Sequence, residues 1–213
     1  MTTPTDIATA LRDDILTGRI QPGEELPQEG LAARFKVSRM PVRDALNALS
    51  AERLVTLRPN RGAQVIALTP DELLEIYDLR ALLECDLAAR AIPMLQPADI
   101  DLIRREMLRC ELEAGTPDFP AADWRFHKAL YAPAGRPRQV RMVEELRALC
   151  QMHQAAYDSL RNQSDRWSED HRVIVDLAAA GQADAAGVAL KRHIEASGAQ
   201  LVGWVREHVA GAE

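Results

Sequence analysis

A helix with a basic start and an apolar remainder constrains this chain more than any other segment. Ser38 is placed to be its N-cap, with the hydroxyl accepting a hydrogen bond from a backbone N–H of the first turn. Pro41 is tolerated in that turn, because the N–H that it lacks has no intrahelical partner. An apolar stripe at i, i+3, i+4 and i+7 follows, formed by Val42, Ala45, Leu46 and Leu49. Arg39 and Arg43 lie one turn apart on a neighbouring face, with Met40 between them in sequence.

Such a helix fits the major groove of DNA. One side packs against the protein, and the two arginines at its exposed start can donate paired hydrogen bonds to guanine or hold phosphates. The alternative is a surface helix with two solvated arginines, so the surrounding sequence has to decide between them.

Charge and composition divide the chain into two parts. Apolar residues make up 47% of the sequence and aromatic residues only 4%, which favours Leu- and Ala-rich helices over a β-sandwich. The net charge is −6, but residues 1–68 hold nine Lys/Arg against eight Asp/Glu, whereas residues 69–213 hold seventeen against twenty-four. We therefore expect an N-terminal domain at 1–68 and an acidic second domain at 69–213.

The pattern of residues 1–68 predicts a winged helix-turn-helix. Helices are expected at about 5–17 and 28–35, followed by the helix described above. Extended pieces at about 54–57 and 63–66 flank a turn that contains Arg61 and Gly62. In this fold the third helix enters the major groove, and the tip of the hairpin reaches the DNA backbone or the minor groove.

The second part reads as helix only and predicts an antiparallel bundle of six to seven helices, so the whole chain is expected to be mostly α. Thr69 is a strong N-cap candidate, since Pro70 and two acidic residues follow it. Proline or glycine separates the expected helices, which cover about 70–92, 97–114, 118–132, 137–162, 165–180 and 183–210.

Four inward-facing side chains of this bundle have the chemistry of metal ligands. Asp123 and His127 lie one turn apart on an apolar helix face, and His171 and His193 lie on the apolar stripes of two further helices. One carboxylate and three imidazoles suit a divalent ion, Zn²⁺ above all, with Ni²⁺, Fe²⁺ and Mn²⁺ as alternatives. The competing interpretation is that these are ordinary core or pocket histidines.

Two arginines also stand on apolar stripes and are candidates for binding an effector. Arg80 lies on the stripe of the first bundle helix, and Arg147 shares a stripe in the fourth with Tyr157, which we take as a third effector-binding candidate. If they face the metal, they can bind a small carboxylate with paired hydrogen bonds. The alternative for Arg80 is an ion pair with Glu84 four residues later.

The first domain resembles the DNA-binding domain of the GntR family of bacterial repressors over about residues 5–68. The matching pieces are Leu11-Arg12-x-x-Ile15-Leu16-x-Gly18, Pro22-Gly23-Glu24-x-Leu26, Leu31-Ala32, Val37-Ser38-Arg39-Met40-Pro41-Val42-Arg43-Asp44-Ala45-Leu46, Leu54-Val55 and Arg61-Gly62-Ala63-x-Val65. Many members carry Thr in place of Met40, and often Gly in place of Lys36. The resemblance implies DNA contacts by Ser38, Arg39, Arg43, Arg61 and Gly62, and we add Met40 to this set.

The second domain resembles the all-helical FCD domain of the FadR-type branch of that family, over about residues 70–200. The matching pieces are Tyr77-x-x-Arg80-x-x-x-Glu84, Asp123-x-x-Phe126-His127-x-x-Leu130, Asp170-His171-x-x-Ile174 and His193-Ile194. The family's metal quartet maps onto Asp123, His127, His171 and His193. Members usually have Glu in place of Asp170 and often Asn in place of Arg136. The founder of the branch binds acyl-CoA and lacks the quartet, so its presence here implies a small organic acid instead.

These features together predict a regulator that binds DNA and responds to a ligand. We expect it to repress transcription and the ligand to relieve the repression. We expect a homodimer on a palindromic operator, because two recognition helices related by a two-fold axis read a palindrome. Three separated cysteines indicate a reduced, cytoplasmic protein, and no apolar run is long enough to span a membrane. The resemblance implies that the protein is bacterial. The alternatives are a metal-dependent enzyme built on the bundle, or a regulator whose metal is structural or is itself the signal.

Overall fold

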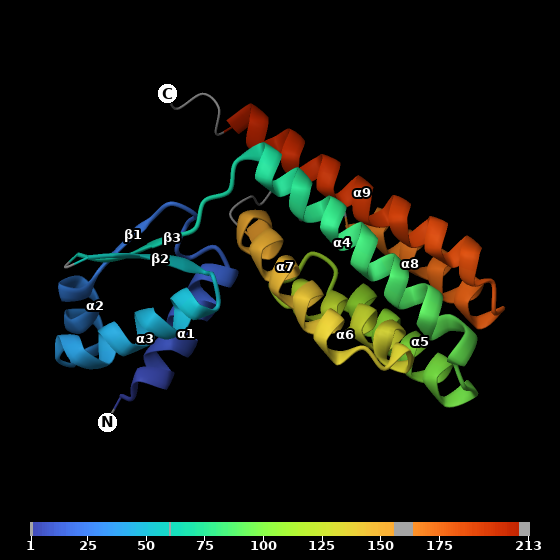
Figure 1. Cartoon of the computed structure of the whole chain (residues 1–213), viewed down its shortest axis with the longest axis horizontal. Coiled ribbons are helices and arrows are strands. Elements are labelled where there is room, and N and C mark those ends of the chain that lie inside the picture. The colour runs from blue at the N-terminus through green and yellow to red at the C-terminus, as the bar shows by residue number, and fades with distance from the viewer. Residues whose placement is uncertain (1, 60, 156–163, 209–213) are drawn as a thin grey trace. The chain divides into compact units, whose positions relative to one another are not determined.

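The computed structural model describes residues 2–59, 61–155 and 164–208 (Figure 1). Its contacts divide it into two compact units, with a boundary between Leu68 and Thr69. A short stretch that begins at Ala148 is grouped with the first unit, which the sequence did not predict. We call residues 2–68 the head and the helices after Thr69 the helical domain.

The head contains three helices and a small antiparallel sheet (Figure 1). Its elements are α1 (Pro4–Leu16), β1 (Glu25–Pro27), α2 (Gln28–Phe35), α3 (Arg39–Ala51), β2 (Val55–Arg58) and β3 (Gly62–Val65). The strand order is β1-β3-β2, so the predicted two-stranded hairpin gains a third strand. Strand β1 has three residues, which is too few to show the alternation of apolar and polar residues typical of a strand. It is defined by its pairing with β3, in which Leu26 lies opposite Ala63.

The core of the head confirms the predicted apolar stripe of α3. Its four residues are buried and pack with the inward side of α1 and with the sheet, in a cluster that includes Ile7, Leu11, Ile15, Val42, Ala45, Leu46, Leu49, Val55 and Val65. Ser38 occupies the N-cap of α3, but the predicted hydrogen bond from a backbone N–H to its hydroxyl is absent. Pro41 contributes to this: an N-cap side chain usually accepts from the second or third residue of the helix, and the third here is Pro41, which has no N–H.

The helical domain consists of six α-helices and two short 3-10 turns in its described residues. They are α4 (Pro70–Ala91), η1 (Ile92–Met94), α5 (Pro97–Leu112), α6 (Phe119–Tyr131), η2 (Ala132–Ala134), α7 (Pro137–Ala155), α8 (Ser164–Ala179) and α9 (Ala183–His208). The predicted cap of α4 is present, because Thr69 and Glu72 form a reciprocal capping box with Pro70 at the helix start. Every predicted helix has a counterpart, and the predicted segment 156–162 lies outside the described residues.

The longest helix of the domain, α9, runs beside α4 (Figure 1). Gly198 permits the close approach, since a Cβ atom at this position would lie 2.6 Å from the ring of Tyr77. Helix α9 thus packs against both α4 and α8, and α6 packs against α4. These four helices surround one interior. Within the part of the chain that the structure describes, no helix combines the length and apolar character needed to cross a bilayer.

Candidate functional site

The four side chains predicted as metal ligands lie together inside the helical domain. Asp123 and His127 come from α6, His171 from α8 and His193 from α9, and one ligand atom of each lies within 4.8 Å of the other three. Asp123 Oδ1 is 3.3 Å from His171 Nε2 and 3.6 Å from His127 Nε2, and the Nε2 atoms of His171 and His193 are 3.3 Å apart. The three histidine residues are at most 6% exposed. The i, i+4 spacing on α6 supplies two of the donors from one helix face.

Each imidazole has a different group at its other nitrogen. His127 Nδ1 lies 3.1 Å from the Tyr131 hydroxyl, and His193 Nδ1 lies 3.4 Å from Asp170 Oδ2. His171 Nδ1 lies 4.0 Å from the thiol of Cys110. These partners leave the three Nε2 atoms directed at the shared interior. Groups that hydrogen-bond to the far nitrogen of a metal-binding histidine produce this arrangement.

The residues present fit a divalent ion. His127 Nε2 is fully buried and has no hydrogen-bond partner among the described residues, which is costly for a polar atom unless something else satisfies it. Three imidazole nitrogens and one carboxylate oxygen are a donor set that first-row divalent metals accept. The cluster is therefore a chemically suitable place for a metal ion, and it leaves the identity of the ion open.

Protonation states in the cluster favour metal ligation. Burial, and next the charge of Arg147, hold the pKa of His127 well below its ordinary value. Burial and the neighbouring His193 lower the pKa of His171 to about 3. Burial alone would raise the pKa of the Asp123 carboxyl, but Arg147 and His171 outweigh it, so the pKa is lowered. At neutral pH these two imidazoles are neutral and the carboxyl is ionised, as a metal requires of its ligands.

The two predicted effector arginines lie beside the cluster and are both engaged by acids. Arg80 Nε donates to Glu84 Oε1 at 2.8 Å, so the predicted i, i+4 ion pair exists. Arg147 donates to Glu84 Oε2 at 3.2 Å and also forms an ion pair with Asp123. The side chains of the two arginines are 8% and 13% exposed, and that of Glu84 is fully buried. The third predicted residue, Tyr157, lies outside the described residues.

Sequence reasoning missed the residues behind the ligands. It treated Glu84 only as a partner of Arg80, and it left Tyr131 and Cys110 unassigned. A signal for Tyr131 was available, because it follows His127 by four residues and therefore lies on the same helix face. Cys110 sits on another helix, and only the packing of α5 against α6 and α8 brings it to the cluster.

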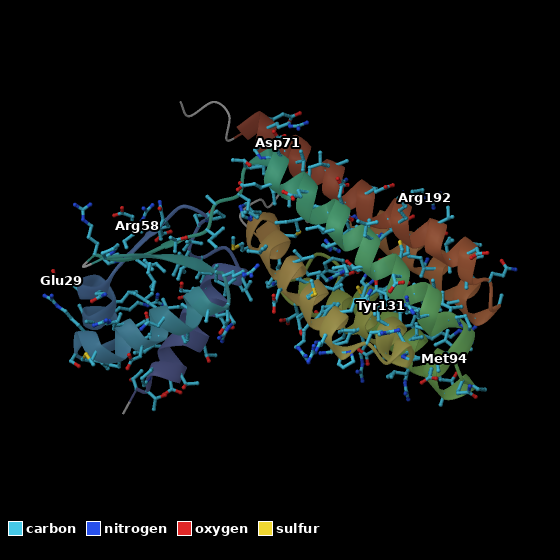
Figure 2. All side chains as sticks on the ribbon, viewed as in Figure 1. Glu29, Arg58, Asp71, Met94, Tyr131 and Arg192 are labelled. Atoms are coloured by element: carbon cyan, nitrogen blue, oxygen red, sulfur yellow. The ribbon has the colours of Figure 1, made fainter. Side chains whose placement is uncertain are left out.

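The predicted DNA-binding residues lie on the surface of the head, with one exception. Ser38, Arg39, Met40 and Arg43 at the start of α3 are exposed, as is Arg61 beside β3. Arg39 forms an ion pair with Glu29 of α2, a residue that is itself exposed (Figure 2). The exception is Gly62, which is buried at φ +127°, where a Cβ atom would lie 2.1 Å from the carbonyl oxygen of Leu26. The geometry gives Gly62 a role in packing β3 against β1.

Two family models match the chain. The model of bacterial regulatory proteins of the gntR family matches residues 3–65, and the model of the FCD domain matches residues 75–196. The matched stretches coincide with the head and with most of the helical domain.

Curated relatives and solved structures agree with these matches. The gluconate operon transcriptional repressor of Bacillus subtilis is 37% identical over 127 residues, which cover 58% of this chain and 52% of that protein. The transcriptional repressor GlaR of Escherichia coli is 34% identical over 143 residues, which cover 64% of this chain and 65% of that protein. The chain thus spans between about half and two thirds of the length of these two relatives.

Among solved structures, a GntR transcriptional regulator from Rhodococcus sp. RHA1 superposes with a TM-score of 0.75 at 29% identity, covering 94% of this chain and 97% of that one. McbR/YncC of E. coli superposes over the same shares with a TM-score of 0.76. McbR/YncC is 19% identical to this chain, so its structural similarity supports the fold alone.

Proposed function

Because this chain belongs to the GntR family of bacterial regulatory proteins and carries an FCD domain, we propose that it is a DNA-binding transcriptional repressor controlled by a small organic acid. The acid binds at the metal cluster of the helical domain and lowers the affinity of the head for its operator. The observation that supports this most strongly is the convergence of four metal-type ligands and two arginines in one interior.

The head supplies the DNA contacts. Arg39 and Arg43 extend from the exposed start of α3, where they reach base edges or phosphates of the major groove, and Arg61 reaches the DNA from the wing. A homodimer places two such helices on the half-sites of a palindrome. The buried core behind α3 holds the helix in place while its basic start stays available.

The helical domain supplies the sensor. Asp123, His127, His171 and His193 would hold the ion, with Zn²⁺ as the preferred metal and Ni²⁺, Fe²⁺ or Mn²⁺ as alternatives. A bound ion offers a Lewis-acid position to a carboxylate oxygen. Arg80 and Arg147 orient the acid, which competes with Glu84 and Asp123 for their guanidinium groups. The Bacillus relative is named for a gluconate operon, which agrees with an organic acid as the class of effector.

Control follows from differential affinity. An acid that binds better to one arrangement of the two heads shifts the population toward that arrangement, and a shift away from the operator spacing relieves repression. The alternative of a metal-dependent enzyme is not retained, because the family and the named relatives are transcription regulators.

A second candidate keeps the repressor and makes the metal structural or the signal itself. The observation in its favour is that Arg147 is already engaged by Asp123 and Glu84, so this cation is paired without an acid. The two candidates differ in what binds after the metal.

Calorimetry separates them. Acetate, lactate, malonate, citrate and gluconate are titrated into zinc-loaded protein freed of unbound metal, and into protein treated with a chelator. The proposal expects at least one acid to bind the loaded form and none to bind the stripped form. Binding of zinc without any binding of acids would favour the second candidate.

A further inference from the structure

Glu84 connects two of the four metal-type ligands through one intermediate residue each. The Tyr131 hydroxyl donates to Glu84 Oε2 at 2.7 Å and lies 3.1 Å from His127 Nδ1. On the other side, Arg147 donates to the same Glu84 oxygen at 3.2 Å and forms an ion pair with Asp123. The five side chains form a closed loop, because Asp123 Oδ1 returns to within 3.6 Å of His127 Nε2.

This loop lies in the interior, where each hydrogen bond fixes the next. Tyr131, Glu84 and His127 are all fully buried, and Figure 2 shows Tyr131 within the helical domain. Burial opposes ionisation of Glu84, but Arg80 and Arg147 outweigh it and lower its pKa. An ionised carboxylate can only accept, so the Tyr131 hydroxyl is the donor of its hydrogen bond to Glu84 Oε2.

The direction of that hydrogen bond settles the tautomer of His127. A phenol oxygen whose proton points at Glu84 presents only lone pairs to the imidazole, so Nδ1 has to carry the proton. His127 Nε2 is then bare, and it is this atom that is buried without a partner among the described residues. The opposite tautomer would place two lone pairs against each other at Nδ1.

We propose that Glu84 is the positioning residue of the metal site. Through Tyr131 it selects the His127 tautomer that offers Nε2 to the ion, and through Arg147 it holds the Asp123 carboxylate. The inference rests on the proposed metal function, and it adds a reason for the placement of both arginines: each pairs with Glu84, so an acid that draws Arg147 away also loosens the support of Asp123.

The first test needs no metal. Histidine is labelled with ¹⁵N in the metal-free, full-length protein, and the ring shifts of His127 report which nitrogen carries the proton. The His127 signals are assigned by their absence in a His127→Gln variant. Wild type is expected to show the Nδ1–H form, and Tyr131→Phe is expected to lose this preference. An unchanged tautomer in Tyr131→Phe would overturn the first half of the proposal.

The second test measures the metal itself, by zinc competition against a coloured chelator and by the absorption spectrum of bound Co²⁺. Glu84→Gln is expected to weaken zinc binding by about 10–100-fold, the usual range for outer-shell partners, and to change the Co²⁺ spectrum. Tyr131→Phe should weaken it by about tenfold at the lower end of that range, and it serves as the second variant if Glu84→Gln fails to fold.

The matched control is Glu106→Gln. Glu106 is another buried acid of the helical domain, and its ion pairs are with Arg109 and Arg125 rather than with groups that reach the ligands. Its zinc affinity and Co²⁺ spectrum should match wild type. If wild type takes up no zinc, the proposed sensor falls and this inference with it. If wild type and Glu84→Gln bind zinc equally well, only the role of Glu84 is refuted.

Discussion

The head and the helical domain keep their candidate functional residues in opposite environments. In the head, the arginines at the start of α3 are exposed, and Asp14 is the buried charged side chain among its described residues. In the helical domain, the candidate ligands and the acids and arginines around them are buried or nearly so. Exposed groups can be replaced at little cost to the fold, whereas removing one member of a buried polar network leaves its partners unsatisfied. The comparison predicts that function and stability separate in the head and are coupled in the helical domain.

The largest effect is expected from His127→Ala. Loss of one of four donors should abolish stoichiometric metal, and with it the rise in melting temperature that an acid produces, because a ligand stabilises only a state that binds it. Elemental analysis and a thermal-shift assay measure the two effects. Operator binding without acid should persist, and retention of a full equivalent of metal would reject the ligand set.

Arg43→Ala should act on DNA binding alone. Removing a groove arginine is expected to cost about 1–3 kcal/mol in operator affinity, with a change in unfolding free energy of no more than about 0.5 kcal/mol. Fluorescence anisotropy with a labelled operator and urea unfolding provide the two numbers. Arg105→Ala, an exposed arginine of α5, is the control. Equal affinity of Arg43→Ala and wild type would remove α3 from the groove.

Asp14 should make the stability of the head depend on pH in the acidic range. Burial alone would raise the pKa of this carboxyl, but Arg34 and Arg19 outweigh it, so the folded pKa lies below the unfolded value of about 3.9. A lowered folded pKa stabilises above the unfolded pKa, and that stability is lost as the pH falls through the folded pKa. Asp14→Asn should therefore lower the free energy of unfolding of the head by about 1–3 kcal/mol at pH 7. Hydrogen exchange of peptides from the head measures this free energy. The gap from wild type should close below about pH 4, and a gap that is constant with pH would contradict this.

Met40→Thr should have the smallest effect of the four substitutions. Met40 is 64% exposed, so its replacement should change the unfolding free energy by less than about 0.5 kcal/mol. Its place between Arg39 and Arg43 leads us to expect a changed preference at one base pair, measured by selection of binding sites from random DNA. A destabilised head with an unchanged preference would show that Met40 packs rather than reads.

Local patterns allowed most of the fold to be predicted, and tertiary packing explains what was missed. The stripe of α3, the N-cap at Thr69 and the inward faces of α6, α8 and α9 depend on spacing along one helix, which a sequence displays directly. Strand β1 depends on its pairing with β3, so its own three residues do not predict it. The predicted side-chain cap at Ser38 is absent, and Pro41 removes one of its two possible donors, a conflict already present in the sequence.

The candidate site divides in the same way. Its four ligand types could be placed on inward faces, because each lies on an apolar stripe. The loop through Glu84, Tyr131 and Arg147 joins α4, α6 and α7, so it depends on how these helices pack and not on any single spacing.

An acid at the buried cluster should govern how the exposed arginines hold DNA. This coupling is measured by the fluorescence anisotropy of a labelled operator with full-length, zinc-loaded protein, titrated with the acid that calorimetry identifies. We predict that the acid weakens operator binding by about 5–150-fold, the usual range of allosteric coupling, and that chelation or His127→Ala removes the response while basal binding persists. A response of equal size in the metal-free protein would show that the metal cluster is not needed for the coupling. An acid that binds without changing operator affinity would show that acid binding and DNA binding are not coupled.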